Sequence, residues 1–315
     1  MTKVDHIIEN NIVTLDGGLG SELEKKHVEV NNNLWSASAL IQNPGIVRDI
    51  HKSYFNAGAQ LAITDTYQVH IPFPNGDQLR GYELIDLAVD LAKEALSDSN
   101  QQQESGLIAG SVGPYGAYLS NGAEYTGDYQ LSQSEYKDFH RERVNRLVQD
   151  NVDVLLLETM PNFEEAKAVV DLISTEFSKI PIFLSFSTEL GEHLWDGTSL
   201  KEVISYFNQN EQIRAIGVNC TAPENIIKAL HNIAPYTEKK IIVYPNAGDT
   251  YDPISKRWVT DHGPINWSEL VPTWYEAGAC LIGGCCRTSP DDIYEINEAV
   301  QQLKKRTANI NEQKR

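Results

Sequence analysis

Short apolar runs alternate with longer amphipathic stretches along the chain, with eight of each. Short runs rich in Ile, Leu and Val are typical of strands buried on both faces. We expect strands over 12–16, 61–66, 107–112, 152–158, 182–187, 215–220, 241–244 and 279–283. Apolar positions spaced by three and four residues predict helices over 45–58, 82–97, 132–150, 163–177, 199–208, 223–234, 266–277 and 290–305. Eight strand–helix units predict an α/β fold, the (β/α)8 or TIM barrel, as a single domain.

Local signals support these boundaries. Helix starts are indicated by Ser132 three residues before Glu135, by Thr198, and by Pro290 at the last helix. The turn at 17–20 lacks the Gly-x-Gly-x-x-Gly spacing of a doubly wound dinucleotide-binding sheet. Residues 1–10 and 304–315 are predicted to be polar tails, so one barrel domain spans 1–315 with its core at about 12–305.

Composition and charge narrow the class of protein. The 315 residues include 44 acidic and 26 basic side chains, for a net charge of −18, which argues against nucleic acid or an anionic membrane as a partner. The chain shows no apolar run of transmembrane length and no signal core at its start, so we expect a cytoplasmic protein. Four cysteines in a chain of this length do not form a disulfide framework. No pattern specifies an oligomeric state.

The residues that follow each predicted strand are mostly polar or reactive. In chain order these segments are 16–18, 65–68, 113–115, 158–159, 185–187, 219–220, 245–248 and 285–286. In a barrel of parallel strands they all lie on one rim, where the active sites of this fold are built. We therefore expect the functional side chains to converge there.

Three of the four cysteines lie at predicted strand ends. Cys220 ends the sixth strand, and Cys285 and Cys286 follow the eighth, with one strand between them in the barrel. Gly283 and Gly284 lack a Cβ atom, so we expect positive φ angles that turn both adjacent sulfurs to one side. Thiolates select zinc over hard cations. The sequence therefore predicts a Zn²⁺ site formed by these three cysteines.

A small apolar role is the alternative for a single buried cysteine. Cys220 taken alone fits that role, but two free thiols side by side are unusual unless a ligand holds them, and a disulfide between neighbours is strained. Cys280 lies five residues before Cys285, about 16 Å away in a strand. We expect ordinary core packing for Cys280.

A zinc ion with three thiolate ligands and an open fourth position binds a thiol substrate in its ionised form. Alkyl transfer onto that sulfur is the natural reaction. We expect Asp16 and Glu158 to hold the ammonium group of an amino-acid thiol, and the backbone N–H groups of Gly17 and Gly18 to hold its carboxylate.

The loop at 113–129 is the longest irregular segment of the rim. It carries four tyrosines, Tyr115 among them, and the carboxylate of Glu124. Aromatic faces and carboxylates suit a cover over a cationic ligand. The alternative for any one tyrosine is that it packs the loop onto the barrel.

Several of these segments together resemble the homocysteine S-methyltransferase family. They are 16–23, 113–119, 158–162, 218–220, 244–248 and 283–288, and the likeness runs from about residue 12 to about residue 299. Gly-Gly-Cys-Cys-Arg with a distant Asn-Cys is its most specific part. The resemblance implies a zinc-dependent barrel with the following roles. Cys220, Cys285 and Cys286 bind the metal, Asn246 is a displaceable fourth ligand, and Asp16, Gly17, Glu158, Asn219, Tyr115 and Glu124 bind substrate.

The resemblance also implies the reaction. The chain is similar to the single-domain branch, which forms methionine by methyl transfer from a sulfonium donor to homocysteine. We expect S-methylmethionine as the preferred donor and S-adenosylmethionine as the other. Two features depart from the family pattern: Asp65 stands where relatives often carry a small residue, and the segment 69–80 is atypical.

Three alternatives to this function are another acceptor, a zinc hydrolase and a non-catalytic zinc-binding barrel. The acceptor is alternatively another thiol or selenol, such as selenohomocysteine or selenocysteine. A zinc hydrolase on the same barrel predicts histidine and carboxylate ligands, but none of the eight histidines lies at a predicted strand end. A non-catalytic zinc-binding barrel requires a closed fourth ligand position.

Overall fold

The structure is a computed structural model, which describes residues 2–9, 11–30, 34–71, 78–101, 105–248, 250–252, 257–259 and 263–313. Eight parallel strands form its sheet: β1 (Val13–Thr14), β2 (Leu61–Ile63), β3 (Leu107–Val112), β4 (Val154–Met160), β5 (Ile182–Phe186), β6 (Ile213–Asn219), β7 (Lys240–Tyr244) and β10 (Ala279–Ile282). Neighbours follow the order β1-β10-β7-β6-β5-β4-β3-β2. A parallel bridge between Leu15 and Leu61 joins the two ends, which confirms the predicted (β/α)8 barrel.

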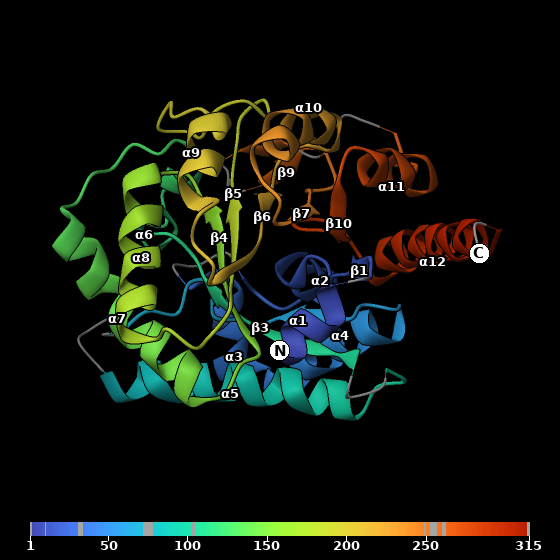
Figure 1. The fold of residues 1–315 in the computed structure, drawn as a ribbon. Coiled ribbons are helices and arrows are strands. Elements are labelled where there is room, and N and C mark those ends of the chain that lie inside the picture. Colours follow the sequence, from blue (N-terminus) through green and yellow to red (C-terminus); the bar gives the residue numbers. More distant parts are fainter. Residues whose placement is uncertain are drawn as a thin grey trace.

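Helices surround the strands (Figure 1). Eight match the predicted pattern: α4 (Pro44–Asn56), α5 (Gln78–Ser97), α7 (Gln133–Gln149), α8 (Phe163–Glu176), α9 (Leu200–Phe207), α10 (Pro223–Ile233), α11 (Trp267–Glu276) and α12 (Pro290–Gln313). The connections contain α1 (Lys3–Ile8), α2 (Leu19–Lys25), α3 (Ser38–Gln42), α6 (Tyr115–Tyr118), the 3₁₀ turns η1 (Trp35–Ala37), η4 (Ala123–Tyr125) and η5 (Ala234–Tyr236), and a hairpin of β8 (Thr250–Asp252) and β9 (Arg257–Val259). Among the described residues, no helix is long and apolar enough to cross a bilayer.

The predicted helix starts are mostly confirmed. Ser132 and Glu135 form a reciprocal capping box at α7, and Pro290 is the first residue of α12. The prediction of Thr198 as a cap was wrong by one residue. Ser199 caps α9, and its hydroxyl accepts a hydrogen bond from the backbone N–H of Glu202, because α9 begins only at Leu200 and the capping hydroxyl bonds the N–H three residues further on.

Residues 2–9 are not a polar tail. Residues 3–8 form α1, capped through a reciprocal box between Thr2 and Asp5, and the helix buries Val4, Ile7 and Ile8. These three side chains pack with the inward-facing apolar residues of the strands. Three apolar positions in six residues are too short a pattern to separate a buried helix from a tail. At the other end of the chain, α12 continues to Gln313, and residues 305–309 within it are exposed.

Apolar side chains form two cores. The inner one fills the barrel with α1 and includes Val13, Leu15, Leu61, Leu107, Ala109, Val154, Leu156, Phe183, Ala215, Ile242, Tyr244 and Leu281. The outer one lies between the strands and the surrounding helices. α1 adds its apolar face to the inner core. The polar residues at the carboxyl ends of the strands lie on the rim, where the active sites of this fold are built.

Candidate active site and metal centre

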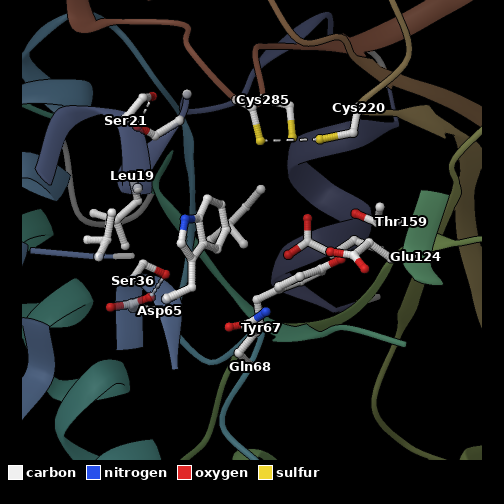
Figure 2. A pocket seen from close by; sticks show the side chains of 18 of the residues that line it. Leu19, Ser21, Ser36, Asp65, Tyr67, Gln68, Glu124, Thr159, Cys220 and Cys285 are labelled. Atoms are coloured by element: carbon white, nitrogen blue, oxygen red, sulfur yellow. Dashed lines mark hydrogen bonds between the residues drawn. The ribbon is translucent and has the colours of Figure 1, made fainter. Parts of the chain in front are cut away.

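Three thiols meet at the carboxyl rim of the barrel. Cys220 directly follows β6, and Cys285 and Cys286 follow β10 after two glycines. The Sγ atoms of Cys220 and Cys286 are 3.6 Å apart, and all three sulfurs lie within 4.8 Å of one another. Figure 2 shows the labelled Cys220 and Cys285 on the same side of one pocket. The topology explains this convergence, because only β7 separates β6 from β10.

The glycines before the cysteine pair act differently from the prediction. Neither Gly283 nor Gly284 has a positive φ angle; the left-handed residues are instead Cys220, at 47°, and Arg287, at 70°. The glycines are required by close approach. A Cβ atom on Gly283 would lie 2.6 Å from the Cβ of Leu15, and one on Gly284 would lie 2.2 Å from Thr288 Oγ1. The expected positive φ angles therefore occur at Cys220 and Arg287 and not at the two glycines.

The thiol cluster fits a soft metal ion. Tetrahedral zinc with Zn–S bonds of about 2.3 Å places its sulfurs about 3.8 Å apart, close to the separations found here. Hydrogen bonds from the thiols of Cys285 and Cys286 lower the pKa of Cys220, and the same coupling raises the pKa values of Cys285 and Cys286. Cys280 is not in the cluster, and its Sγ lies 3.8 Å from the carbonyl oxygen of Ile241.

Asn219 positions the residues around the cluster. Its Oδ1 accepts hydrogen bonds from Thr159 N and Ser185 Oγ, both at 2.8 Å. Its Nδ2 donates to Thr159 Oγ1 at 2.8 Å and to Cys285 Sγ at 3.9 Å. Because both ends of this fully buried amide are engaged, Asn219 holds Thr159 and Cys285 in place from behind the cavity wall.

Carboxyl groups line the cavity beside the thiols. Asp16 Oδ2 accepts from Ile63 N at 2.8 Å, while Glu158 accepts from the hydroxyls of Ser111 and Tyr244. Burial, with a smaller contribution from the neighbouring Glu158, raises the pKa of Asp16 well above its usual range. Burial also raises the pKa of Glu158 to about 7. Among the described residues, neither carboxyl has an ion-pair partner that would favour its charged form.

The cavity encloses about 170 Å³, and several acceptors of its lining residues are unpaired in the part of the chain that the structure describes. Four buried side-chain oxygens on its wall have no hydrogen-bond partner among the described residues: Asp16 Oδ1, Asp65 Oδ2, Gln68 Oε1 and Glu124 Oε2. Unpaired buried acceptors are unfavourable. A ligand rich in N–H groups or positive charge would satisfy them.

Backbone strain is concentrated at the same place. Among the described non-glycine residues, seven have positive φ angles, and four of these line the cavity: Trp35, Ser120, Thr159 and Cys220. Strained φ angles accumulate where a site imposes them. The sequence gives no signal for these positions, since none of the four is Gly, Asn or Asp, the residue types that commonly adopt such angles.

Three buried polar side chains fix the loop at 113–129 over the cavity, and the sequence pattern did not predict them. We call this group the clamp: Glu165 on α8, and His140 and Arg143 on α7. Glu165 accepts from Tyr115 N at 2.6 Å, His140 Nε2 at 2.8 Å and the Tyr129 hydroxyl. Arg143 donates to the carbonyl oxygen of Gly113 at 2.6 Å and to His140 Nδ1 at 2.8 Å. Burial lowers the pKa of His140, so a neutral ring that donates through Nε2 fits both partners.

The other predicted site residues take several positions. Glu124 lines the cavity, and burial raises its pKa to about 7. Tyr115 is not among the residues that line the cavity, and its ring packs against Phe139. Asn246 donates to the carbonyl oxygen of Cys220 at 3.4 Å and accepts from Gly248 N.

Two expectations concern backbone groups and the atypical segment. Gly17 lies on the cavity wall, but the N–H of Gly18 donates to Thr288 O at 3.1 Å and is not available to a substrate carboxylate. Within the segment 69–80, residues 72–77 lie outside the described residues.

The fold and site define an enzyme-like barrel with a trithiol centre at the rim that commonly carries catalysis. Comparison with known proteins identifies the class. The family model for homocysteine S-methyltransferase matches residues 13–300. Homocysteine S-methyltransferase YbgG of Bacillus subtilis (strain 168) is 39% identical over 317 residues, covering 96% of this chain and 99% of that protein. Homocysteine S-methyltransferase of Escherichia coli (strain K12) is 42% identical over 296 residues, covering 90% and 94%.

A solved structure agrees. The metallated form of the homocysteine methyltransferase MmuM from Escherichia coli aligns with a TM-score of 0.82 and 37% identity, covering 94% of this chain and 99% of that chain. The chain therefore belongs to the homocysteine S-methyltransferase family, and it is a methyltransferase.

Proposed function

We propose that this methyltransferase transfers a methyl group from a sulfonium donor, S-methylmethionine in preference to S-adenosylmethionine, to homocysteine, with Zn²⁺ as its metal. A new S–CH₃ bond forms at homocysteine while the S–CH₃ bond of the donor breaks. The electron pair of that bond stays on the leaving sulfur, and the thiol proton of homocysteine is released. With S-methylmethionine, both products are methionine. The observation that carries this proposal is the thiol cluster in the wall of an acid-lined cavity.

The residues present fit a zinc ion. Cys220, Cys285 and Cys286 supply three soft ligands at suitable separations, and three protein ligands leave the fourth position open, as in catalytic zinc sites. When bound there, zinc lowers the pKa of a fourth sulfur ligand, so that a substrate thiol is ionised at neutral pH. Asn246, next to the carbonyl of Cys220, is the proposed displaceable ligand.

The side chains around the thiols orient the acceptor. Asp16 and Glu158 approach from the ends of β1 and β4, and both lack a cationic partner among the described residues. The ammonium group of homocysteine supplies one. Holding this group fixes the distance between the amino-acid end and the sulfur, and such positioning lowers the barrier by removing the entropy of alignment.

The cavity selects a cationic donor. Sulfonium compounds carry a positive charge next to the methyl group that is transferred. Glu124 lines the cavity, and its buried Oε2 has no partner among the residues that the structure describes. Tyr67 and Tyr125 add aromatic faces to the same wall, and such faces attract cations. The clamp holds the loop that carries Glu124 and Tyr125 in place.

Methionine formation by the purified, zinc-loaded protein tests the proposal. Homocysteine is the acceptor, and S-methylmethionine, S-adenosylmethionine and betaine are compared as donors. We expect turnover with the two sulfonium donors, fastest with S-methylmethionine, and loss of turnover after zinc chelation. Turnover only with selenohomocysteine or selenocysteine would change the acceptor. No turnover with any pair, from protein that carries zinc, would contradict the proposed reaction and favour a non-catalytic zinc-binding barrel.

A further inference from the structure

A second acidic position lies in the cavity, on a different rim connection from those of Asp16 and Glu158. Figure 2 shows Ser36 and Asp65 on one side of the pocket and Glu124 and Thr159 on the other. Asp65 follows β2, and Ser36 lies in η1. The two residues come from separate rim connections, and both line the cavity.

Asp65 is a buried carboxyl with one oxygen left open. It is 3% exposed, and its Oδ1 accepts a hydrogen bond from Ser36 Oγ at 2.6 Å. Its Oδ2 is buried and has no partner among the described residues, and no ion pair there involves Asp65. A carboxylate in this state is unfavourable unless a ligand supplies a donor or a positive charge.

A second acceptor accompanies it. Gln68 lies three residues further along the same connection, and its Nε2 donates to the carbonyl oxygen of Ala117 at 3.1 Å. This bond fixes the amide of Gln68, which lines the cavity, and its buried Oε1 has no partner within the described part of the chain. A carboxylate oxygen and an amide oxygen match an ammonium group, which offers three donors.

Asp65 is electrostatically separate from the other cavity acids. Asp16 is affected by the charge of Glu158, and Glu158 and Glu124 are affected by Cys220. The pKa of Asp65 is raised to about 7 by burial, opposed only by its bond from Ser36. Asp65 therefore offers a position for positive charge in addition to the one beside the thiols.

We propose that Asp65, oriented by Ser36 and assisted by Gln68, binds the α-ammonium group of the methyl donor. This inference rests on the proposed function and makes the cavity a site for two amino acids. Asp16 and Glu158 hold the acceptor, and Asp65 holds the donor. A quaternary ammonium donor such as betaine has no N–H group to offer Asp65, so the same position disfavours it.

Substitution of Asp65 combined with a donor that lacks the ammonium group tests the assignment. The zinc-loaded protein, Asp65→Asn and Ser36→Ala are assayed with S-methylmethionine and with 4-(dimethylsulfonio)butanoate, which keeps the sulfonium and carboxylate groups but has no amino group. We expect Asp65→Asn to raise the KM for S-methylmethionine at least about tenfold and to leave the KM for homocysteine within about twofold. Ser36→Ala should change the KM for S-methylmethionine in the same direction by less. The deamino donor should have the same kcat/KM with the native protein and with Asp65→Asn.

Glu24→Gln is the matched control, because it removes a negative charge from the same cavity wall without touching Asp65. We expect the KM for S-methylmethionine to stay within about twofold in this variant. Equal losses with both donors in Asp65→Asn, a raised KM for homocysteine, or no change at all would overturn the assignment.

Binding without turnover separates this inference from the proposed reaction. Calorimetric titration of S-methylmethionine into the native protein and into Asp65→Asn, without homocysteine, requires no methyl transfer, and Trp35 on the cavity wall provides a fluorescence signal. At least tenfold weaker binding to Asp65→Asn supports the subsite even if the acceptor proves to be another thiol. Equal binding to both proteins would contradict it.

Discussion

Buried carboxylates occur in two neighbouring regions of this molecule, and their hydrogen-bonding states are opposite. In the cavity, Asp16, Asp65 and Glu124 each keep a buried oxygen without a partner among the described residues. In the clamp, both oxygens of Glu165 accept hydrogen bonds, and Arg143 is close enough to affect the group electrostatically. Asp16 and Asp65 are each 3% exposed and Glu165 is fully buried, so the difference does not come from the depth of burial.

The comparison separates two uses of buried charge. A carboxylate whose partners are all supplied by the protein fixes structure, and removing it leaves those partners unpaired. A carboxylate with a free oxygen lowers the stability of the empty protein and is satisfied only by a ligand. We therefore expect changes in the cavity to alter binding and catalysis, and changes in the clamp to alter stability.

The largest effect is expected at the metal centre. Cys220→Ser removes one of three soft ligands, so metal content and methyl transfer should fall together. We expect activity to drop by at least about 1,000-fold, equivalent to about 4 kcal/mol, while circular dichroism still reports a folded barrel. Metal analysis by mass spectrometry and the methionine assay measure both quantities.

Cys280→Ser is the matched control for that experiment. Cys280 lies next to the inner core, away from the cluster, so metal content and activity should stay at the native level. Full metal occupancy in Cys220→Ser, or loss of metal in Cys280→Ser, would contradict the ligand assignment.

The second largest effect is expected in the clamp, on the free energy of unfolding. Glu165→Gln removes the charge that Arg143 faces and weakens the bonds to His140 and Tyr129. Loss of this charge leaves the buried guanidinium of Arg143 without the negative charge near it, which costs about 3 kcal/mol of unfolding free energy, measurable by urea denaturation. The neighbouring Glu164→Gln should change the free energy of unfolding by less than about 0.5 kcal/mol, because the Glu164 side chain is 55% exposed in its ion pair with Lys167. Similar stabilities for the two variants would remove the distinction between the regions.

The third effect concerns the pH dependence of stability in the ligand-free protein. The pKa of Asp65 is about 7 in the folded state, against an ordinary value of 3.8. The folded state therefore binds this proton more tightly than the unfolded state, and stability falls as pH rises from about 4 through 7. Asp65→Asn removes that dependence. Its unfolding free energy relative to the native protein should be higher at pH 8 than at pH 5 by on the order of 2 kcal/mol, and parallel pH curves for the two proteins would contradict this.

The sequence was sufficient to predict the barrel and the thiol cluster. Alternating apolar runs and amphipathic stretches determine the order of strands and helices, and parallel strands bring their carboxyl ends to one rim. Cys220 and Cys285 could therefore be placed together from their positions at strand ends, although 65 residues separate them. Asp16 and Glu158 could be assigned to the same cavity for the same reason.

Other features depend on contacts that no local pattern encodes. The clamp joins α7, α8 and the loop at 113–129 through Arg143, His140 and Glu165, and each of these residues alone is typical of an exposed helix face. The left-handed φ angles of Trp35 and Cys220 arise from the surrounding packing. The pairing of Asp65 with Ser36 likewise required the folded chain, because the two residues come from different connections.

The smallest of the four effects is expected for Glu158→Gln, the cavity substitution that contrasts most directly with Glu165→Gln in the clamp. Glu158→Gln keeps the size of the side chain and can still bond to Ser111 and Tyr244, but it removes the negative charge proposed to hold the ammonium group of homocysteine. We expect the KM for homocysteine to rise about tenfold, equivalent to about 1.4 kcal/mol, while metal content and the KM for the sulfonium donor stay at native values.

Stability should respond in the opposite sense to Glu165→Gln. Burial raises the pKa of Glu158 to about 7, so a neutral amide removes an unfavourable charge from the empty cavity, and the free energy of unfolding at pH 8 should be equal to or above the native value. The same substitution, Glu to Gln, then weakens binding at position 158 and folding at position 165. Urea denaturation measures the free energy of unfolding of both variants, and steady-state kinetics measures their KM for homocysteine. A loss of stability in Glu158→Gln with an unchanged KM would place Glu158 among the structural carboxylates and outside the acceptor site.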